Sequence, residues 1–173
     1  MSQDPSESER GDLVDRIQAE WAQAYPQYDV APIAVLGRIQ RVASVASQRL
    51  DRQLEQHGVT RSEFDVLGAL ARAGRPLRAS EVVSTTTLSG ASITKLTEAL
   101  VRRGLVRRGR SPVDGRVVLL EVTDAGRGVV DQELPRRLAD DEAVLAGLSP
   151  RERETLVVLL RRVARSLEDS PRP

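Results

Sequence analysis

Residues 106–122 interrupt a chain in which apolar residues otherwise recur at helical spacing. The two ends of this segment fit paired strands, and Ser-Pro-Val-Asp-Gly at 111–115 is typical of a turn between them. The segment therefore predicts a β-hairpin, and no other part of the chain indicates one convincingly. A single hairpin among helices makes the expected fold mainly α-helical with a small β-hairpin.

Helical spacing and capping residues predict the elements on both sides of the hairpin. The expected helices cover about residues 11–25, 32–57, 61–73, 79–84, 89–103, 123–138 and 150–167. Capping boxes formed by Thr60 with Glu63 and by Ser149 with Glu152 mark two of the helix starts. Pro135 is expected to kink or break the helix that contains it.

Arginine is concentrated around the hairpin, although the whole chain has a net charge of only +1. Residues 101–120 hold a single acid, Asp114. Their arginines are Arg102, Arg103, Arg107, Arg108, Arg110 and Arg116. Such a concentration of one charge favours a polyanionic partner.

The helix expected at 89–103 has the pattern of a helix that reads DNA. Ile93, Leu96 and Leu100 share one face on a helical wheel, and this face should be buried. Small and hydroxyl residues lie opposite, near the helix start, where a helix in the major groove makes most of its contacts. An ordinary surface helix fits this pattern equally well by itself. The arginine-rich hairpin just beyond it favours DNA.

The stretches FDVLGAL, LRASEV, LSGASITKLTEALVRRGLVRR, SPVDGR and LEVTDAGR, in this order, resemble the MarR family of bacterial regulators over roughly residues 38–167. The resemblance implies a winged helix-turn-helix in a dimeric MarR-like architecture. It assigns residues 59–122 to DNA binding and residues 31–58 and 123–168 to dimerisation. The implied function is a homodimer that binds a palindromic operator in double-stranded DNA, usually as a repressor. Whether this chain represses or activates is left open.

The resemblance also implies which side chains meet DNA. On the major-groove helix these are Ser89, Ala91, Ser92, Thr94 and Lys95. On the wing, Arg116 matches the arginine of an Asp-x-Arg pattern in which Asp114 is the aspartate that holds it. The family often has a second arginine where this chain has Gly115, and our hypothesis is that Arg110 compensates for it.

An accessory helix and linker at residues 10–30 resemble those of the urate-responsive MarR subfamily. That resemblance implies an effector pocket lined by Trp21 and Asp65. Leu96 stands where the subfamily has an arginine that senses the anionic ligand, so we expect a small aromatic or carboxylate effector rather than urate. Alternatively, Trp21 only packs the accessory helix against the core, and Asp65 forms a salt bridge within its helix.

Other function classes find little support in the sequence. The chain has no cysteine, and His57 is its only histidine, which excludes disulfides and multi-histidine or thiolate metal centres. We interpret His57 as a residue at the end of a helix, and we expect no catalytic site, no metal and no cofactor. A helical protein that binds acidic protein partners remains as the alternative, although it would not need a wing.

The ends of the chain are polar. Residues 1–9 are expected to be disordered, and residues 169–173 to form a flexible tail. There is no apolar run long enough to cross a bilayer and no signal-peptide pattern, so we expect a cytoplasmic protein with no membrane partner.

Overall fold

The computed structural model describes residues 11–86 and 88–169. The chain forms two compact units, residues 1–56 and residues 57–173. The disorder expected for residues 1–9 lies outside the described residues. So does the expected tail, except for Asp169, which is the last residue of a helix. Within the described residues, no helix is both long enough and apolar enough to span a bilayer.

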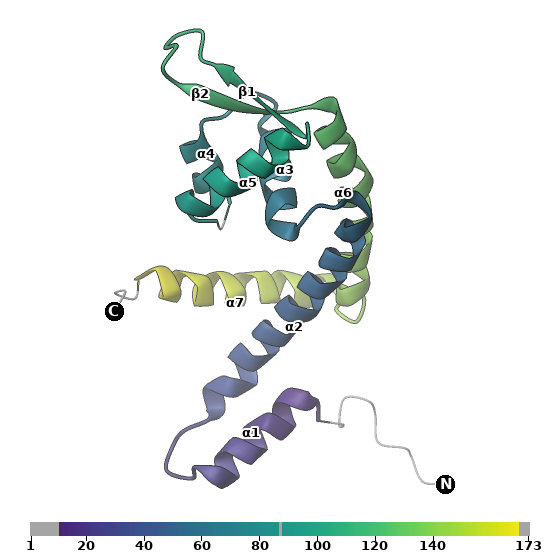
Figure 1. Cartoon of the computed structure of the whole chain (residues 1–173). Coiled ribbons are helices and arrows are strands. Elements are labelled where there is room, and N and C mark those ends of the chain that lie inside the picture. The colour runs from purple at the N-terminus through teal and green to yellow at the C-terminus, as the bar shows by residue number, and fades with distance from the viewer. Residues whose placement is uncertain (1–10, 87, 170–173) are drawn as a thin grey trace. The chain divides into compact units, whose positions relative to one another are not determined.

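The first unit is a pair of helices, α1 (Leu13–Ala24) and α2 (Ala31–Leu54), which lie side by side (Figure 1). Asp12 caps α1 by accepting the backbone N–H of Val14 at 2.7 Å. Val14 is 3% exposed and lies against Gly37, where an added Cβ would be only 2.9 Å from a Val14 methyl group. The helices therefore approach closely at a position where only glycine fits without adjustment. A 3-10 turn, η2 (Glu55–His57), follows α2.

The second unit contains the predicted hairpin and the helices around it. Its elements are α3 (Arg61–Ala73), α4 (Ala79–Ser84), α5 (Gly90–Arg102), β1 (Val106–Arg110), β2 (Val118–Val122), α6 (Asp124–Leu145) and α7 (Pro150–Asp169). The expected capping boxes are present: Glu63 accepts the N–H of Thr60 at 2.9 Å, and Glu152 accepts that of Ser149 at 2.8 Å. The mainly α-helical fold with one β-hairpin is thus confirmed.

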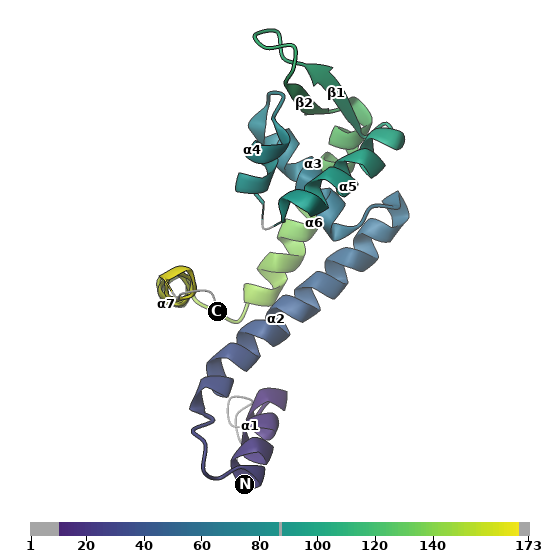
Figure 2. The ribbon, with the colours of Figure 1, turned by 60° about the vertical axis from the view of Figure 1, so that its left-hand side comes forward.

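Helix α3 supplies the centre of the core of the second unit. Five of its apolar side chains are at most 4% exposed, namely Phe64, Val66, Leu67, Ala69 and Leu70. Val82 of α4 and Ile93 and Leu100 of α5 are completely buried. Burial of each such side chain contributes roughly 1.5–3 kcal/mol. This core packs α4 and α5 against α3, and Figure 2 shows the three helices together.

The hairpin is attached to the core through backbone contacts. β1 and β2 pair antiparallel, with Val106 opposite Val122. Leu77, between α3 and α4, exchanges two backbone hydrogen bonds with Leu120, at 2.9 and 2.7 Å. The base of the wing is therefore fixed, while its turn extends beyond α4 and α5 (Figures 1 and 2).

The expected break at Pro135 is wrong. α6 continues through this proline to Leu145 instead of ending near Leu138. A proline inside a helix removes one backbone hydrogen bond. The residues next to it, Glu133 and Leu134 before and Arg136 to Ala139 after, have good helix propensity and favour continuation of the helix.

A buried carboxylate, Glu133 of α6, connects this helix to the start of the second unit. It is 0% exposed, and its Oε1 lies 2.9 Å from Nε2 of His57 and 2.8 Å from Nη1 of Arg136. His57 ends the 3-10 turn, as interpreted from the sequence, and its side chain also contacts this carboxylate. The sequence did not indicate Glu133, because its partner His57 is 76 residues away.

Candidate nucleic-acid interface

One face of α5 is exposed over its first turns. Ala91, Ser92, Thr94 and Lys95 all lie on the surface, and so does Ser89 at the N-cap. The opposite face is buried in the core of the second unit. The structure therefore brings the five residues expected in the major groove together on one accessible surface.

The buried face of α5 differs by one residue from the expectation. Ile93, Thr97 and Leu100 are buried, whereas Leu96 is only half-buried. Thr97 is tolerated there because its hydroxyl donates to the carbonyl of Thr94 at 3.0 Å, which satisfies a polar group that burial would otherwise penalise.

Hydroxyl groups order the first turn of α5. The hydroxyl oxygen of Ser89 accepts the backbone N–H of Ser92 at 3.4 Å and lies 2.9 Å from the Ser92 hydroxyl. Thr94 donates to the carbonyl of Gly90 at 3.4 Å. The small side chains at this end leave the backbone accessible, which suits close approach to a DNA groove.

The wing turn is held by backbone and carboxylate hydrogen bonds. Ser111 N–H donates to the Val117 carbonyl at 2.9 Å. The carboxylate of Asp114 accepts the backbone N–H of Arg116 at 3.0 Å. Asp114 therefore fixes the backbone that carries Arg116 and leaves its guanidinium exposed. Arg110, at the end of β1, is exposed too.

Half of the clustered arginines are paired with acids that come from other parts of the sequence. The pairs are Arg103 with Glu63 (3.4 Å), Arg107 with Glu121 (2.8 Å) and Arg108 with Glu98 (4.0 Å). The hydrogen bond from Arg107 lowers the pKa of the Glu121 carboxyl. Among the described residues, no acid lies within 4.0 Å of Arg102, Arg110 or Arg116. The charge available to a polyanion is thus concentrated on fewer side chains than the sequence indicated.

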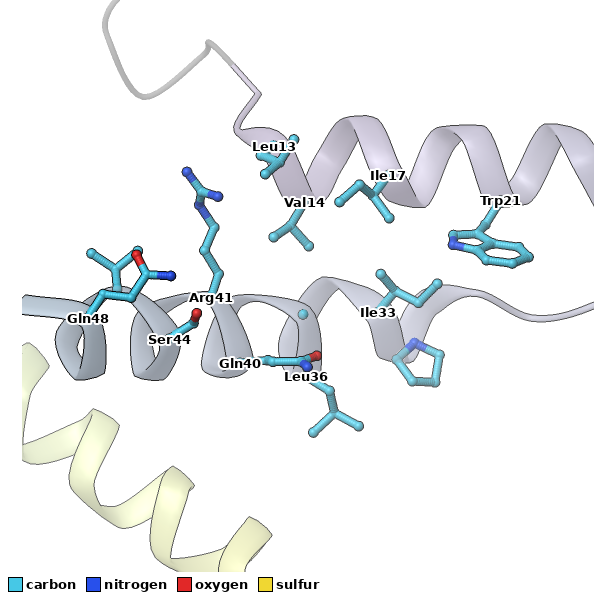
Figure 3. A pocket seen from close by; sticks show the side chains of 13 residues that line it. Leu13, Val14, Ile17, Trp21, Ile33, Leu36, Gln40, Arg41, Ser44 and Gln48 are labelled. Carbon is cyan, nitrogen blue, oxygen red and sulfur yellow. The ribbon is translucent and has the colours of Figure 1, made fainter. Parts of the chain in front are cut away.

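Trp21 and Asp65, the expected effector residues, belong to different units. Trp21 of α1 is 48% exposed and lines a groove within the first unit (Figure 3). Asp65 of α3 is half-buried, and burial raises the pKa of its carboxyl against the opposing effect of Arg137 and other arginines. No cation in the described part of the chain lies within ion-pair distance of Asp65, which argues against a salt bridge within its helix. That Trp21 and Asp65 share a pocket stays a prediction.

Comparison with known proteins gives a consistent picture. A model of the MarR family matches residues 57–117. The HTH-type transcriptional regulator PecS of Dickeya dadantii is 28% identical over 156 residues, covering 89% of this chain and 94% of PecS. The uncharacterised HTH-type transcriptional regulator YkoM of Bacillus subtilis is 30% identical over 122 residues, covering 70% of this chain and 79% of YkoM.

A solved structure of BpsR from Bordetella bronchiseptica, whose DNA binding is regulated by 6-hydroxynicotinic acid, is also similar. It has a TM-score of 0.66 and 26% identity, and the match covers 79% of this chain and 94% of BpsR. These similarities give no support to the alternative of a protein that binds acidic protein partners. The chain is a member of the MarR family of HTH-type transcriptional regulators, with a winged helix-turn-helix that binds DNA.

Proposed function

We propose that the chain is a ligand-responsive repressor that binds palindromic double-stranded DNA as a homodimer. The exposed start of α5 beside a wing with unpaired arginines is the observation that carries this proposal. Ser89, Ala91, Ser92, Thr94 and Lys95 contact the major groove. Arg110 and Arg116 contact phosphates or the minor groove, and Asp114 keeps the wing turn in shape.

Exposed apolar side chains on the long helices support a homodimer. Among the described side chains of α7 none is buried, and Leu156, Leu159 and Leu160 are 37–50% exposed. α2 exposes Val35 and Val42 by more than half. Apolar surface of this extent usually marks an interface. We therefore assign residues 31–58 and 123–168 to dimerisation, so that two copies of α5 meet half-sites about 34 Å apart.

An effector is supported by the similarity to BpsR, whose DNA binding responds to a small acid. We propose a small aromatic or carboxylate effector, with Trp21 and Asp65 as its contacts, as in the urate-responsive subfamily with an extra N-terminal helix. An effector releases DNA only if it binds the DNA-incompetent arrangement more tightly. We place the protein in the cytoplasm and assign it no enzymatic activity.

Selection of bound DNA from a random pool tests the proposal. Two inverted half-sites separated by about one helical turn are expected. On the selected site, Arg116→Gln should weaken DNA binding about fivefold to tenfold. It should also reduce the slope of log affinity against log salt concentration by about one, the loss of one phosphate contact. Arg107→Gln is the matched control on the same hairpin, because Arg107 is already paired with Glu121.

Three outcomes would contradict parts of this proposal. If the chain does not bind DNA at low salt, the proposal that it is a DNA-binding repressor is wrong. Selected sites with a single half-site would refute the homodimer. Equal losses for Arg116→Gln and Arg107→Gln would refute the role of Arg116 on the wing.

A further inference from the structure

Arg78 stands at the start of α4, where an arginine is unfavourable. As the N-cap residue of this helix, it makes no capping hydrogen bond with its side chain. The N-caps of α1, α3, α5 and α6 all accept backbone N–H groups with their side chains; they are Asp12, Thr60, Ser89 and Thr123. A guanidinium has no acceptor atom, and a cation is disfavoured at the positive end of a helix.

Residues that break a local rule in this way are expected at functional or strained sites. Strain does not explain Arg78, because its φ of −73° and ψ of 154° are ordinary values for an extended residue. Its side chain is exposed, so packing in the core does not explain it either. A role for the guanidinium at the surface remains.

The charge of Arg78 is available to a partner. Among the described residues, no acid lies within 4.0 Å of its guanidinium. Glu81, three residues later, uses its two oxygens elsewhere: Oε1 accepts from Nη2 of Arg75 at 2.7 Å, and Oε2 accepts the backbone N–H of Arg78 at 2.7 Å. The pKa of the Glu81 carboxyl is lowered, mainly by the hydrogen bond from Arg75, and the charge of Arg78 contributes least. Arg75 is therefore paired, whereas Arg78 is not.

The backbone beside Arg78 is attached to the wing. Leu77 exchanges two hydrogen bonds with Leu120 on one edge of β2, and β1 pairs with the other edge, where Arg110 lies opposite Val118. At spacings of about 4.8 Å between strands and about 3.4 Å between residues, the Cα atoms of Arg78 and Arg110 lie roughly 10 Å apart across β2. Figures 1 and 2 show α4 next to the hairpin. Two exposed arginines thus flank the same strand.

The surroundings of Arg78 leave room for a DNA strand. Ala79 and Ser80, which follow it, are small and exposed. α4 packs against α5, whose first turns form the proposed major-groove surface, and in a helix-turn-helix the first helix crosses the DNA backbone. Arg78 lies outside residues 31–58 and 123–168, which we assign to dimerisation, so the partner subunit does not cover it.

From these observations we propose that Arg78 binds a phosphate of the DNA backbone beside the groove that α5 enters. Its guanidinium donates two N–H groups to the phosphate oxygens and fixes the duplex relative to the wing. The contact reads no base. It adds a third element, α4, to the DNA-binding surface, and it rests on the proposed DNA-binding function.

Arg78→Ser tests the proposal, because stability and DNA binding should change in opposite directions. Serine is a preferred N-cap, so the midpoint of thermal unfolding should rise by roughly 2–4 °C. Affinity for the selected operator should fall about fivefold to tenfold, and the slope of log affinity against log salt concentration should fall by about one. Affinity for a duplex of scrambled sequence should fall by the same factor, since a phosphate contact carries no sequence information.

Two further variants separate charge from position. Arg78→Lys keeps the charge but not the paired donors, so it should retain the salt slope and recover only part of the affinity. Arg61→Gln is the matched control and should leave the affinity nearly unchanged. It removes another exposed arginine, at the opposite end of α3, roughly 18 Å along that helix from the turn that leads to Arg78.

Three results would overturn the proposal. They are an Arg78→Ser variant that binds the operator as tightly as the unchanged chain, a loss confined to the operator and absent from the scrambled duplex, and an equal loss for Arg61→Gln. In each case the unchanged chain still binds DNA, so the proposed repressor stands while the role of Arg78 falls. An unchanged chain that binds no DNA at low salt overturns both.

Discussion

The two units of this protein are stabilised in different ways. In the second unit α3, α4, α5 and the hairpin share a core with several fully buried side chains, and backbone hydrogen bonds attach the wing. In the first unit Val14 is the one buried residue of α1, and the ion pairs that hold α1 on α2 are exposed. The unit that carries the proposed DNA-reading surface therefore has an extensive core, whereas α1 is held on α2 by one buried residue and exposed ion pairs.

A glycine at a close helix contact illustrates this difference in each unit. A Cβ at Gly126 of α6 would overlap the carbonyl oxygen of Leu105 and lie 3.0 Å from a methyl group of Val122. A Cβ at Gly37 of α2 would meet only the side chain of Val14. The Leu105 carbonyl is part of the backbone at the base of the wing, so displacing it costs more than shifting the side chain of Val14.

The largest expected effect is that of Gly126→Ala. We expect it to lower the free energy of unfolding by about 3 kcal/mol, because the overlap with Leu105 displaces the base of the wing. Urea denaturation at fixed protein concentration measures this. Gly128→Ala is the matched control: nothing lies within 4 Å of its added Cβ, so it should be neutral or stabilise by up to about 1 kcal/mol. Equal stabilities for the two variants would contradict the close contact at Gly126.

The second effect compares a buried carboxylate with an exposed one. Glu133→Gln changes the group that contacts His57 and Arg136, and it should cost about 2 kcal/mol because the Glu133 side chain is fully buried. Glu142→Gln on the same helix breaks a pair with Arg153 in which Glu142 is 65% exposed, and it should change stability little. Thermal unfolding of both variants measures the difference; a loss as large for Glu142→Gln would argue against burial as the cause.

Gly37→Ala should have a smaller and more local effect. We expect a cost of about 1 kcal/mol, confined to the contact between α1 and α2, since the Val14 side chain must shift. Faster amide exchange in α1 with unchanged exchange in α3 would show this. Combining it with Val14→Ala should restore slow exchange in α1. Slower exchange in the single variant would mean that the helices are farther apart than described.

The smallest effect concerns pH. The hydrogen bond from Arg38 lowers the pKa of the Asp15 carboxyl, so this carboxylate stabilises the helix pair above the ordinary aspartate pKa of about 4. The stabilisation is lost as the pH falls through the lowered pKa of the folded state. Trp21 emission should follow this loss, and Arg38→Gln should remove it. An identical acid profile in Arg38→Gln would show that the pair contributes nothing.

Local signals explain why much of the fold was predictable. α4 occupies residues 79–84 as expected, and Ser89 and Gly104 bound α5 as the sequence indicated. N-cap residues, glycines that end a helix and the spacing of apolar residues all involve positions close together in the chain, so the sequence indicates them directly. The continuation of α6 through Pro135 was not predictable from such signals, because the local rule that proline ends a helix does not hold at this position.

The residue pattern alone determined the order of elements, the exposed face of α5 and the arginine-rich wing, because each is encoded by neighbours in the chain. Only the tertiary structure decided which charges are available. Glu63 and Glu121 pair with Arg103 and Arg107. Among the described residues no carboxylate pairs with Arg41, whereas Arg38 pairs with Asp12 and Asp15. Ion pairs act over a few ångströms in space, and the chain brings together groups that lie tens of positions apart, so counting charges along the sequence does not show which of them remain free.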